Sequence, residues 1–414
     1  MRKLLYMLSM AALLLTITSC GDNDNFTETI FDTETPAVDQ NAATAPFDQW
    51  LYDNFVVPYN VEIQYKFNFP ASNLDFQLTP AEYKKSQLLS HFIRYLFYDV
   101  YTLYGGEDFM KKYGPRIFHY IGSSAYSPTT GTETLGYASA GVKITLINVN
   151  NMKFWTENDP YTPADMELLN KDQFHTMHHE FSHILHQTKS YPVDFGQVTP
   201  DTYEPRNWQE RDSVESNRLG YITQYGSSAS YEDFVETLSC TITDTDCRWM
   251  HAIINACLNG GVKEGDKQEI YTLIDSLEIE GLDDPDKNWN NFVIYKESAL
   301  NEETGKYEET GRYVPSFPNS DHRTDAMGHS ETTLKFERVT EFKSFRSFLD
   351  NWVETDTSSE VKGINAILKK LDIATKWYTE KWGLHLFEIR REVRKRQTNI
   401  NDYVRDHVTI YDYK

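Results

Sequence analysis

The amino-acid sequence predicts an α+β fold, in which a small mixed sheet is followed by a long helix and a largely helical C-terminal part. Strands are indicated where β-branched and aromatic residues alternate with polar ones, in Asn60–Phe69 and Gly141–Asn150. The long helix is indicated by apolar residues that recur every three or four positions between Phe174 and Leu185. Helical spacing returns in much of residues 343–414.

The N-terminus has the pattern of an export signal. Met1–Lys3 is basic, Leu4–Ile17 is apolar, and small residues lead to Cys20. Because the apolar run is too short to remain as a membrane span, residues 1–19 are predicted to be a cleaved signal peptide. Residues 20–45 are rich in Thr, Asp, Asn and Ala and lack apolar periodicity, which predicts a flexible tether.

The tetrapeptide Ile17–Cys20 resembles the lipobox of bacterial lipoproteins. The resemblance implies cleavage before Cys20 and lipidation of its thiol; the alternative is an ordinary secretory signal with an incidental cysteine. The following Gly21–Asn25 is similar to the acidic tag that sends lipoproteins of Bacteroidota to the cell surface. These features predict an outer-membrane lipoprotein that is exposed at the cell surface.

The formal net charge of −22 argues against nucleic-acid binding, which needs concentrated Lys and Arg. Apart from Cys20, the chain has Cys240, Cys247 and Cys257. At most one disulfide can form among these three, with Cys240–Cys247 as the candidate pair. Their spacing matches no C-x-x-C knuckle, so no structural metal site is expected there.

Several elements are predicted before the long helix. Thr79–Pro80 has the composition of a helix start, and Gly105–Gly106 is expected to end that helix. A short helix over Glu107–Tyr113 and a strand over Arg116–Ser123 follow. Thr162–Pro163 offers a further helix start, with a second start near Asn170 as the alternative.

The long helix contains the motif H-E-x-x-H. His179 and His183 are one helical turn apart, so both imidazoles leave the same face with about 6 Å between their Cβ atoms. Two imidazoles placed in this way are typical ligands of zinc, and the pair His179 and His183 is called the zinc clamp below. Glu180 lies about 100° round the helix, where it can reach a water at the metal without entering the coordination shell. The sequence therefore predicts a Zn²⁺ site with Glu180 as the general base.

Three further histidines occur on the same helix. His175 and His186 share the face of the zinc clamp, each one turn beyond it, and are expected to line the cleft or to contact the ligands. His178 falls near the apolar side and is expected to be a buried, hydrogen-bonded histidine.

Two histidines leave one protein ligand to find. The H-E-x-x-H-x-x-G-x-x-H class is excluded, because the chain has His186 and Lys189 at the last glycine and histidine positions. Asp194 stays open as an aspartate ligand, although it lacks the usual G-T-x-D-x-x-Y context. The remaining class takes a glutamate from a second helix. The downstream candidates are Glu204, Glu210, Glu215, Glu232 and Glu236.

The segment Ser230–Leu238 places Glu232 and Glu236 four residues apart on one helical face. One carboxylate can coordinate the metal while the other accepts the distal N–H of a ligand histidine, which fixes the tautomer and the ring angle. Spacing alone leaves both glutamates open as the ligand.

The H-E-F-x-H box followed by Glu232–Glu236 (E-D-F-V-E) resembles glutamate-ligand zinc peptidases related to the catalytic domain of anthrax lethal factor. With the lipobox, the chain is similar to zinc metallopeptidase lipoproteins of Bacteroidota that accompany SusC/SusD-type nutrient-import systems. The resemblance implies a zincin-like catalytic domain in which Glu232 is the third ligand, Glu236 orients a histidine and Glu180 is the base. It also implies a peptide or protein substrate and an import complex as a partner.

Two further expectations rest on known zinc peptidases. These relatives carry a tyrosine about seven residues before the ligand glutamate, which is Tyr225 here, and its phenol could donate to an oxyanion. Tyr231 and Tyr221 are alternatives, and packing is the other explanation. The strand beside the H-E-x-x-H helix commonly lies at the sheet edge and pairs with substrate, which makes Gly141–Asn150 the candidate; the alternative is a core strand.

The predicted domain order follows from these elements. Residues 46–285 are expected to form the catalytic domain and residues 286–342 a β-rich insertion or lid with a hairpin at Asn301–Gly305. Residues 343–414 are expected to be helices packed on the catalytic domain. The predicted function is a zinc-dependent metallopeptidase. The alternatives are a zinc hydrolase of another amide or a glycopeptide, and a non-catalytic substrate-binding lipoprotein.

Overall fold

The computed structural model describes residues 38–67, 77–126, 133–134, 136–139, 143–258, 262–277, 292–316, 334–352 and 363–413. The predicted signal peptide, Cys20 and most of the predicted tether lie outside the described residues. Within the described ranges, no helix combines the length and the apolar character that crossing a bilayer requires.

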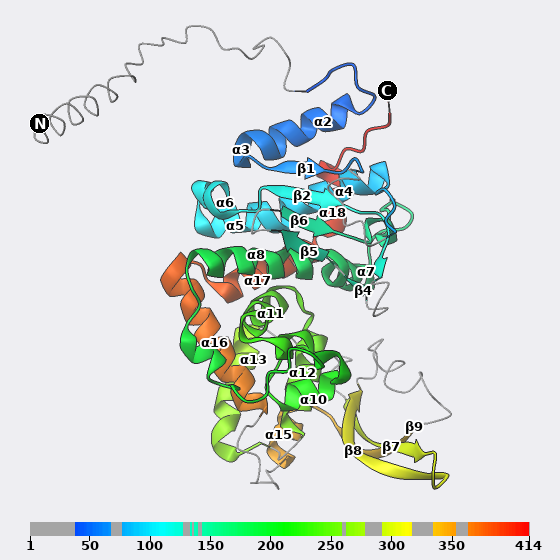
Figure 1. The fold of residues 1–414 in the computed structure, drawn as a ribbon, viewed down its shortest axis with the longest axis vertical. Coiled ribbons are helices and arrows are strands. Elements are labelled where there is room, and N and C mark those ends of the chain that lie inside the picture. The colour runs from blue at the N-terminus through cyan, green and yellow to red at the C-terminus, as the bar shows by residue number, and fades with distance from the viewer. Residues whose placement is uncertain are drawn as a thin grey trace, which may run out of the picture.

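The fold is α+β and mostly helical (Figure 1). The helices are α2 Ala45–Leu51, α3 Val57–Tyr59, α4 Tyr83–Ile93, α5 Asp99–Gly105, α6 Glu107–Tyr113, α7 Pro163–Leu169, α8 His175–Thr188, α9 Val193–Gly196, α10 Ser213–Arg218, α11 Ser230–Thr243, α12 Asp246–Cys257, α13 Lys267–Leu277, α15 Phe345–Asn351, α16 Gly363–Trp382, α17 Leu386–Thr398 and α18 Ile400–His407. The strands are β1 Glu62–Gln64, β2 Ile117–Tyr120, β3 Ala125–Tyr126, β4 Glu133–Thr134, β5 Gly136–Ser139, β6 Lys143–Leu146, β7 Phe292–Asn301, β8 Lys306–Ser316 and β9 Leu334–Phe342.

The main sheet is small and mixed, with strand order β1-β2-β6-β5. β1, β2 and β6 are parallel, and β5 pairs antiparallel with β6. The prediction that the strand within Gly141–Asn150 lies at the sheet edge is therefore wrong, because β6 is an inner strand and β5 is the edge strand. The edge was missed because Gly136 and neighbouring small residues give β5 only a weak strand pattern.

The helix that carries the histidines begins at the predicted cap. The Thr162 hydroxyl accepts from the Asp165 amide while the Asp165 carboxylate accepts from the Thr162 amide, so the two residues form a capping box. A π-helical turn over Asn170–Phe174 joins α7 to α8 without a break. The alternative start near Asn170 marks this change of pitch rather than a new helix.

The earlier helix begins later than predicted. Thr79–Pro80 is not its N-terminus, because Pro80 forms a β-bridge with Ile121 and the helix begins at Tyr83. The predicted end is confirmed: the helix stops at Gly105, and Gly106 has a φ of 86°, which a residue with a side chain rarely adopts.

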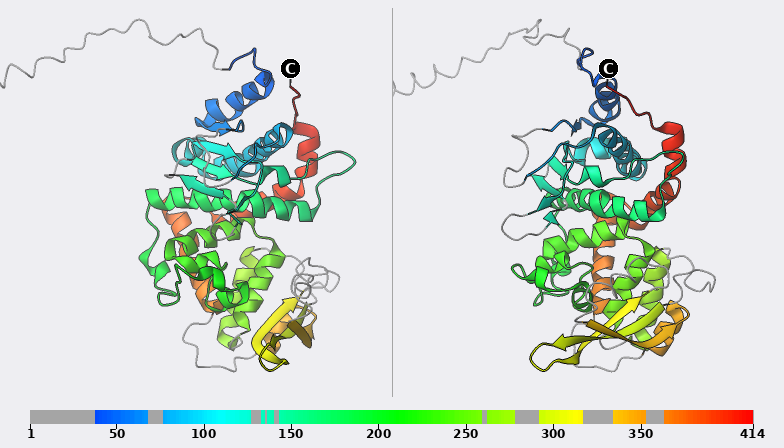
Figure 2. Two further views of the ribbon diagram at one scale, coloured as in Figure 1. Left: turned by 45° about the vertical axis from the view of Figure 1, so that its right-hand side comes forward. Right: turned by 90° about the vertical axis from the view of Figure 1, so that its right-hand side faces the viewer.

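α8 lies between the main sheet and α11 (Figures 1 and 2). The C-terminal helices α16 and α17 both pack against α11, so residues far apart in the chain share one hydrophobic core. Gly383, with a φ of 68°, separates these two helices.

Residues 292–342 contain a three-stranded antiparallel sheet of order β8-β7-β9. The predicted hairpin is present, with Gly305 at a φ of 62° in its turn. Figures 1 and 2 show this sheet at the opposite end of the molecule from the main sheet, beyond α10 and α12. It therefore does not cover α8, and the predicted domain boundaries stay a prediction.

Buried neutral histidines give the fold a predicted sensitivity to acid. His91, His119 and His178 are at most 3% exposed, and burial lowers their pKa values to about 4, 4 and 3, respectively. The unfolded chain takes up these protons below about pH 6.5, whereas the folded chain does not. The free energy of unfolding is therefore highest above pH 6.5 and should fall by ~1.4 kcal/mol per pH unit per histidine as the pH drops towards 4.

Urea unfolding of metal-free protein at pH 7 and pH 5 measures this fall. The His119→Leu variant removes one of the three protons, so it should show a shallower pH dependence than the wild type. Equal slopes for the two proteins would contradict the prediction.

Candidate metal centre

The two faces of α8 are those that its sequence predicts. Met177, Phe181 and Leu185 are fully buried, whereas His175, His179 and His183 contact glutamates of α11. His178 is also fully buried, and its Nδ1 lies 3.0 Å from the hydroxyl of Tyr101. The expectation of a buried, hydrogen-bonded histidine at this position is confirmed.

The nitrogen and oxygen atoms of His179, His183 and Glu232 converge on one point. The Nε2 atoms of His179 and His183 are 3.1 Å apart, and Oε2 of Glu232 is 3.2 Å from each of them. Ligand atoms ~2.0–2.1 Å from a tetrahedral zinc ion are separated by about 3.3 Å. The three atoms therefore fit a zinc ion with its fourth position open.

The electrostatics of this group favour a positive charge at its centre. Burial lowers the pKa of His179, but its hydrogen bonds to Glu232 and Glu236 outweigh burial and raise the pKa to about 10. Burial raises the pKa of Glu232, whereas its hydrogen bonds to His179 and His183 lower that pKa to about 2. A proton or a divalent cation can supply the favoured charge.

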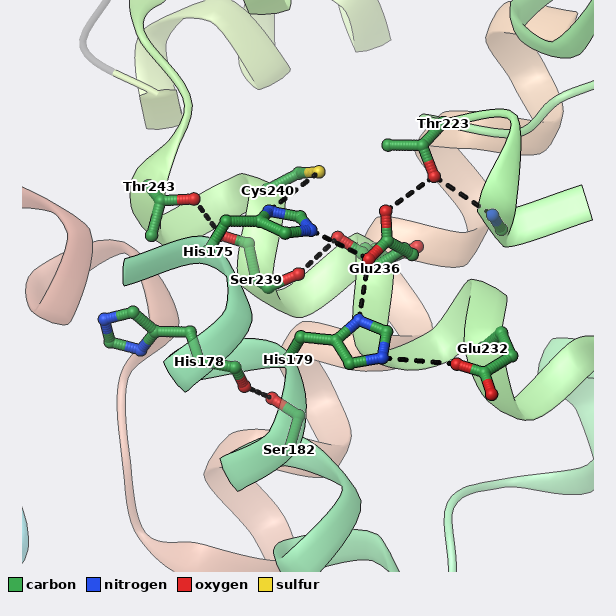
Figure 3. Close-up of polar contacts among 12 residues, drawn as sticks. His175, His178, His179, Ser182, Thr223, Glu232, Glu236, Ser239, Cys240 and Thr243 are labelled. Carbon is green, nitrogen blue, oxygen red and sulfur yellow. Dashed lines mark hydrogen bonds and ion pairs between the residues drawn. The ribbon is translucent and has the colours of Figure 1, made fainter. Parts of the chain in front are cut away.

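Glu236 holds His179 from the side away from this centre (Figure 3). His179 Nδ1 donates to Glu236 Oε1 over 2.7 Å, so the lone pair on Nε2 is left for a metal. His175 Nε2 lies 2.9 Å from the same oxygen, and the Thr223 hydroxyl donates to Oε2 over 2.6 Å. The Glu236 side chain is buried, with 3% of the residue exposed, and these three partners contact its carboxylate oxygens.

The Thr223→Val variant should weaken zinc binding about 10- to 100-fold, the usual effect of removing a group that orients a ligand. Valine has a similar shape, but it leaves the buried Glu236 Oε2 without its hydroxyl donor. Thr223→Ser keeps that donor and should bind zinc like the wild type. Competition titration with a zinc chelator measures both variants; equal affinity for Thr223→Val and the wild type would contradict this role.

His183 is oriented by another histidine. Its Nδ1 lies 2.9 Å from Nε2 of His186, one helical turn later. Burial lowers the pKa of His186 to about 4, so this ring is neutral and can accept the Nδ1 proton of His183. That bond again leaves the Nε2 lone pair of the ligand directed at the centre. The Nε2 atoms of His179 and His183 and Oε2 of Glu232 are called the donor triangle below. His186 contacts one of these ligands and is not itself part of the donor triangle.

Within the part of the chain that the structure describes, two other groups of side chains could hold a metal ion. One comprises His175, His179 and Glu236, but its contacts are the short hydrogen bonds described above and Thr223 occupies the second carboxylate oxygen. The other comprises His175, Cys240 and Asp244. There, Arg248 already pairs with Asp244 over 3.3 Å, and burial raises the pKa of the Cys240 thiol well above its usual range. Neither group fits zinc as well as the donor triangle.

The remaining predicted residues are placed as follows. Tyr225 has its ring centroid 5.8 Å from that of His179. Burial and a hydrogen bond to the charged Glu232 raise the pKa of the Tyr225 phenol, which therefore keeps its proton. Glu180 is half-buried, and its charge acts on both His179 and Tyr225.

The two alternative tyrosines differ in position. Tyr231 lies near the centre, with its ring 6.2 Å from that of His183. Tyr221 is fully buried, and its hydroxyl lies 2.7 Å from that of Thr202, so it is not part of the site.

Cys240 and Cys257 are free thiols, so the Cys240–Cys247 disulfide is not formed. Thr223 was missed by sequence reasoning, because it lies in a loop where spacing carries no signal.

Comparison with known families identifies the chain. A family model described as "Putative zinc-binding metallo-peptidase" matches residues 40–281, more than half of the chain. The chain belongs to this zinc-binding metallopeptidase family. The matched region contains both α8 and α11, and so all three members of the donor triangle. No curated protein matches the chain significantly.

One solved structure supports the fold. The crystal structure of a zinc-binding metallo-peptidase from Bacteroides caccae, described in the same words as the family, matches with a TM-score of 0.53 and 23% sequence identity. The match covers 92% of this chain and 100% of that chain. It therefore extends past the family model into the C-terminal helices, and at this identity it shows the shared fold alone.

Proposed function

We propose that this metallopeptidase hydrolyses peptide bonds with a zinc ion held by His179, His183 and Glu232. The observation that carries the proposal is the donor triangle, whose edges of 3.1–3.2 Å suit tetrahedral zinc. Zinc supplies Lewis-acid chemistry in such a site, polarising a carbonyl and making water a stronger nucleophile. Family membership supports the choice of metal.

The chain's own residues supply proton transfer and orientation. Glu180 takes the proton of the attacking water and passes it to the leaving amine, as a half-buried carboxylate next to His179 can do. Tyr225 keeps its proton and donates a hydrogen bond to the scissile carbonyl oxygen as negative charge develops there. Glu236 and His186 hold the two ligand histidines in their tautomers.

The proposed setting is the outside of the cell. The lipobox around Cys20 supports a lipoprotein anchored in the outer membrane, and the acidic Gly21–Asn25 supports export to the surface. There the enzyme would process peptides or proteins for a SusC/SusD-type import complex. This setting rests on the sequence patterns of the N-terminal residues.

Mass-spectrometric profiling of a peptide library tests the activity. Zinc-loaded protein should cleave the library, chelated protein should not, and added zinc should restore the same set of cleavage sites. Cleavage of a different amide or of glycopeptides alone would point to another zinc hydrolase. Zinc binding without cleavage of any substrate class would overturn the proposal in favour of a binding protein.

A further inference from the structure

A cavity of about 460 Å³ is lined in part by His186, the residue that contacts the ligand His183. Its lining includes His186, Tyr191, Gln197, Tyr203 and Ser230. The volume lies within the usual range of ligand pockets. No residue that lines it among those the structure describes is Asp, Glu, Lys or Arg.

The cavity begins one side chain away from the metal ligands. The rings of His183 and His186 are 5.2 Å apart. Ser230 lines the cavity, while its neighbour Tyr231 has its ring 6.2 Å from that of His183. Residues in an extended peptide advance by ~3.3–3.4 Å each, and their side chains alternate between faces. One or two residues of such a peptide span the 5.2 Å between these rings.

The lining of the cavity includes three aromatic rings, those of His186, Tyr191 and Tyr203. Tyr191 stacks on Phe234 with ring centroids 4.9 Å apart, and its hydroxyl lies 3.0 Å from the Ser230 hydroxyl. Tyr203 donates its hydroxyl to Asp233 over 2.8 Å. Because these hydroxyls are already engaged, the tyrosines offer mainly their ring surfaces to a ligand. Gln197 is exposed and lines the cavity with an amide that can both donate and accept.

We propose that this cavity is the specificity subsite of the peptidase and takes a large, uncharged aromatic side chain, tyrosine best, from a residue next to the cleaved bond. The proposal rests on the proposed function. Aromatic rings gain by packing against the rings of Tyr191 and Tyr203, and the Gln197 amide can pair with a phenol. A charged side chain would lose water and find no opposite charge in the lining.

Charge substitution at Gln197 tests the subsite. Peptides that differ only by Tyr, Lys or Glu at each position near the cleaved bond are compared by kcat/KM. At one position, the wild type should prefer Tyr by about tenfold or more. At that same position, Gln197→Glu should raise kcat/KM for the Lys peptide by about tenfold. Gln197→Lys should raise kcat/KM for the Glu peptide by the same factor, which corresponds to ~1.4 kcal/mol. Exposed Gln187, which does not line the cavity, gives the matched controls Gln187→Glu and Gln187→Lys, which should leave the profile unchanged.

Two results would overturn the subsite. One is a preference among the three peptides that is the same in the wild type and in both Gln197 variants. The other is a wild-type preference for charged residues at every position. If the wild type cleaves no peptide at all, the proposed function fails, and the subsite is then decided by binding. Fluorescence anisotropy with zinc-loaded Glu180→Gln protein should show the Tyr peptide binding most tightly and the same reversal by Gln197 substitutions. Equal binding of the three peptides would overturn it.

Discussion

The Glu180→Gln variant is expected to keep its zinc and to lose about a thousandfold or more of its peptidase kcat. Glutamine has nearly the same shape as glutamate, but it cannot take a proton from water at neutral pH. General bases contribute ~10²–10⁴-fold to enzymatic rates. The ligand atoms belong to His179, His183 and Glu232, so the donor triangle does not change. Steady-state kinetics and zinc content of the purified variant together measure the effect.

The two readouts separate the roles that Glu180 could have. Loss of turnover with full zinc content supports a base, whereas loss of zinc would show that Glu180 helps to hold the metal. Unchanged kcat would make the assignment of the base wrong. Glu380→Gln, at an exposed position on α16, is a matched control that removes the same charge and should change neither quantity.

The local part of the site could be predicted from the sequence, because helix geometry fixes it. The four-residue spacing places His179 next to His183, and the same spacing places Glu232 next to Glu236 on a second helix. The sequence places these two pairs opposite each other, on α8 and α11, only through a resemblance to known peptidases, since no spacing rule joins the two helices. The structure brings these four side chains together.

Contacts between distant segments could not be predicted. Thr223 reaches Glu236 from a loop, and the edge strand β5 is defined only by its pairing with β6. Tertiary packing, rather than local preference, decides each of these features.

One contact between distant segments supports α11, the helix that carries both glutamates. Lys370 on α16 lies 2.6 Å from the carboxylate of Asp233, and both side chains are at most 2% exposed. Lys370 Nζ also donates to the Gly220 carbonyl over 2.9 Å. Burial lowers the pKa of Lys370 and raises that of Asp233, so burial works against both charges. Each charge therefore depends on the other to remain ionised inside the protein.

The Lys370→Met variant should therefore destabilise the protein by ~3–5 kcal/mol, because it leaves the Asp233 carboxylate buried without its partner. Such a loss is a large part of the stability of a typical protein. Adding Asp233→Asn removes the unpaired charge and should recover part of the loss. Lys376→Met, which breaks an exposed ion pair with Asp372 on the same helix, should cost less than ~1 kcal/mol. Urea unfolding measures all three variants, and equal costs for Lys370→Met and Lys376→Met would contradict the argument. Because Asp233 adjoins Glu232, Lys370→Met should also weaken zinc binding, whereas Lys376→Met should not.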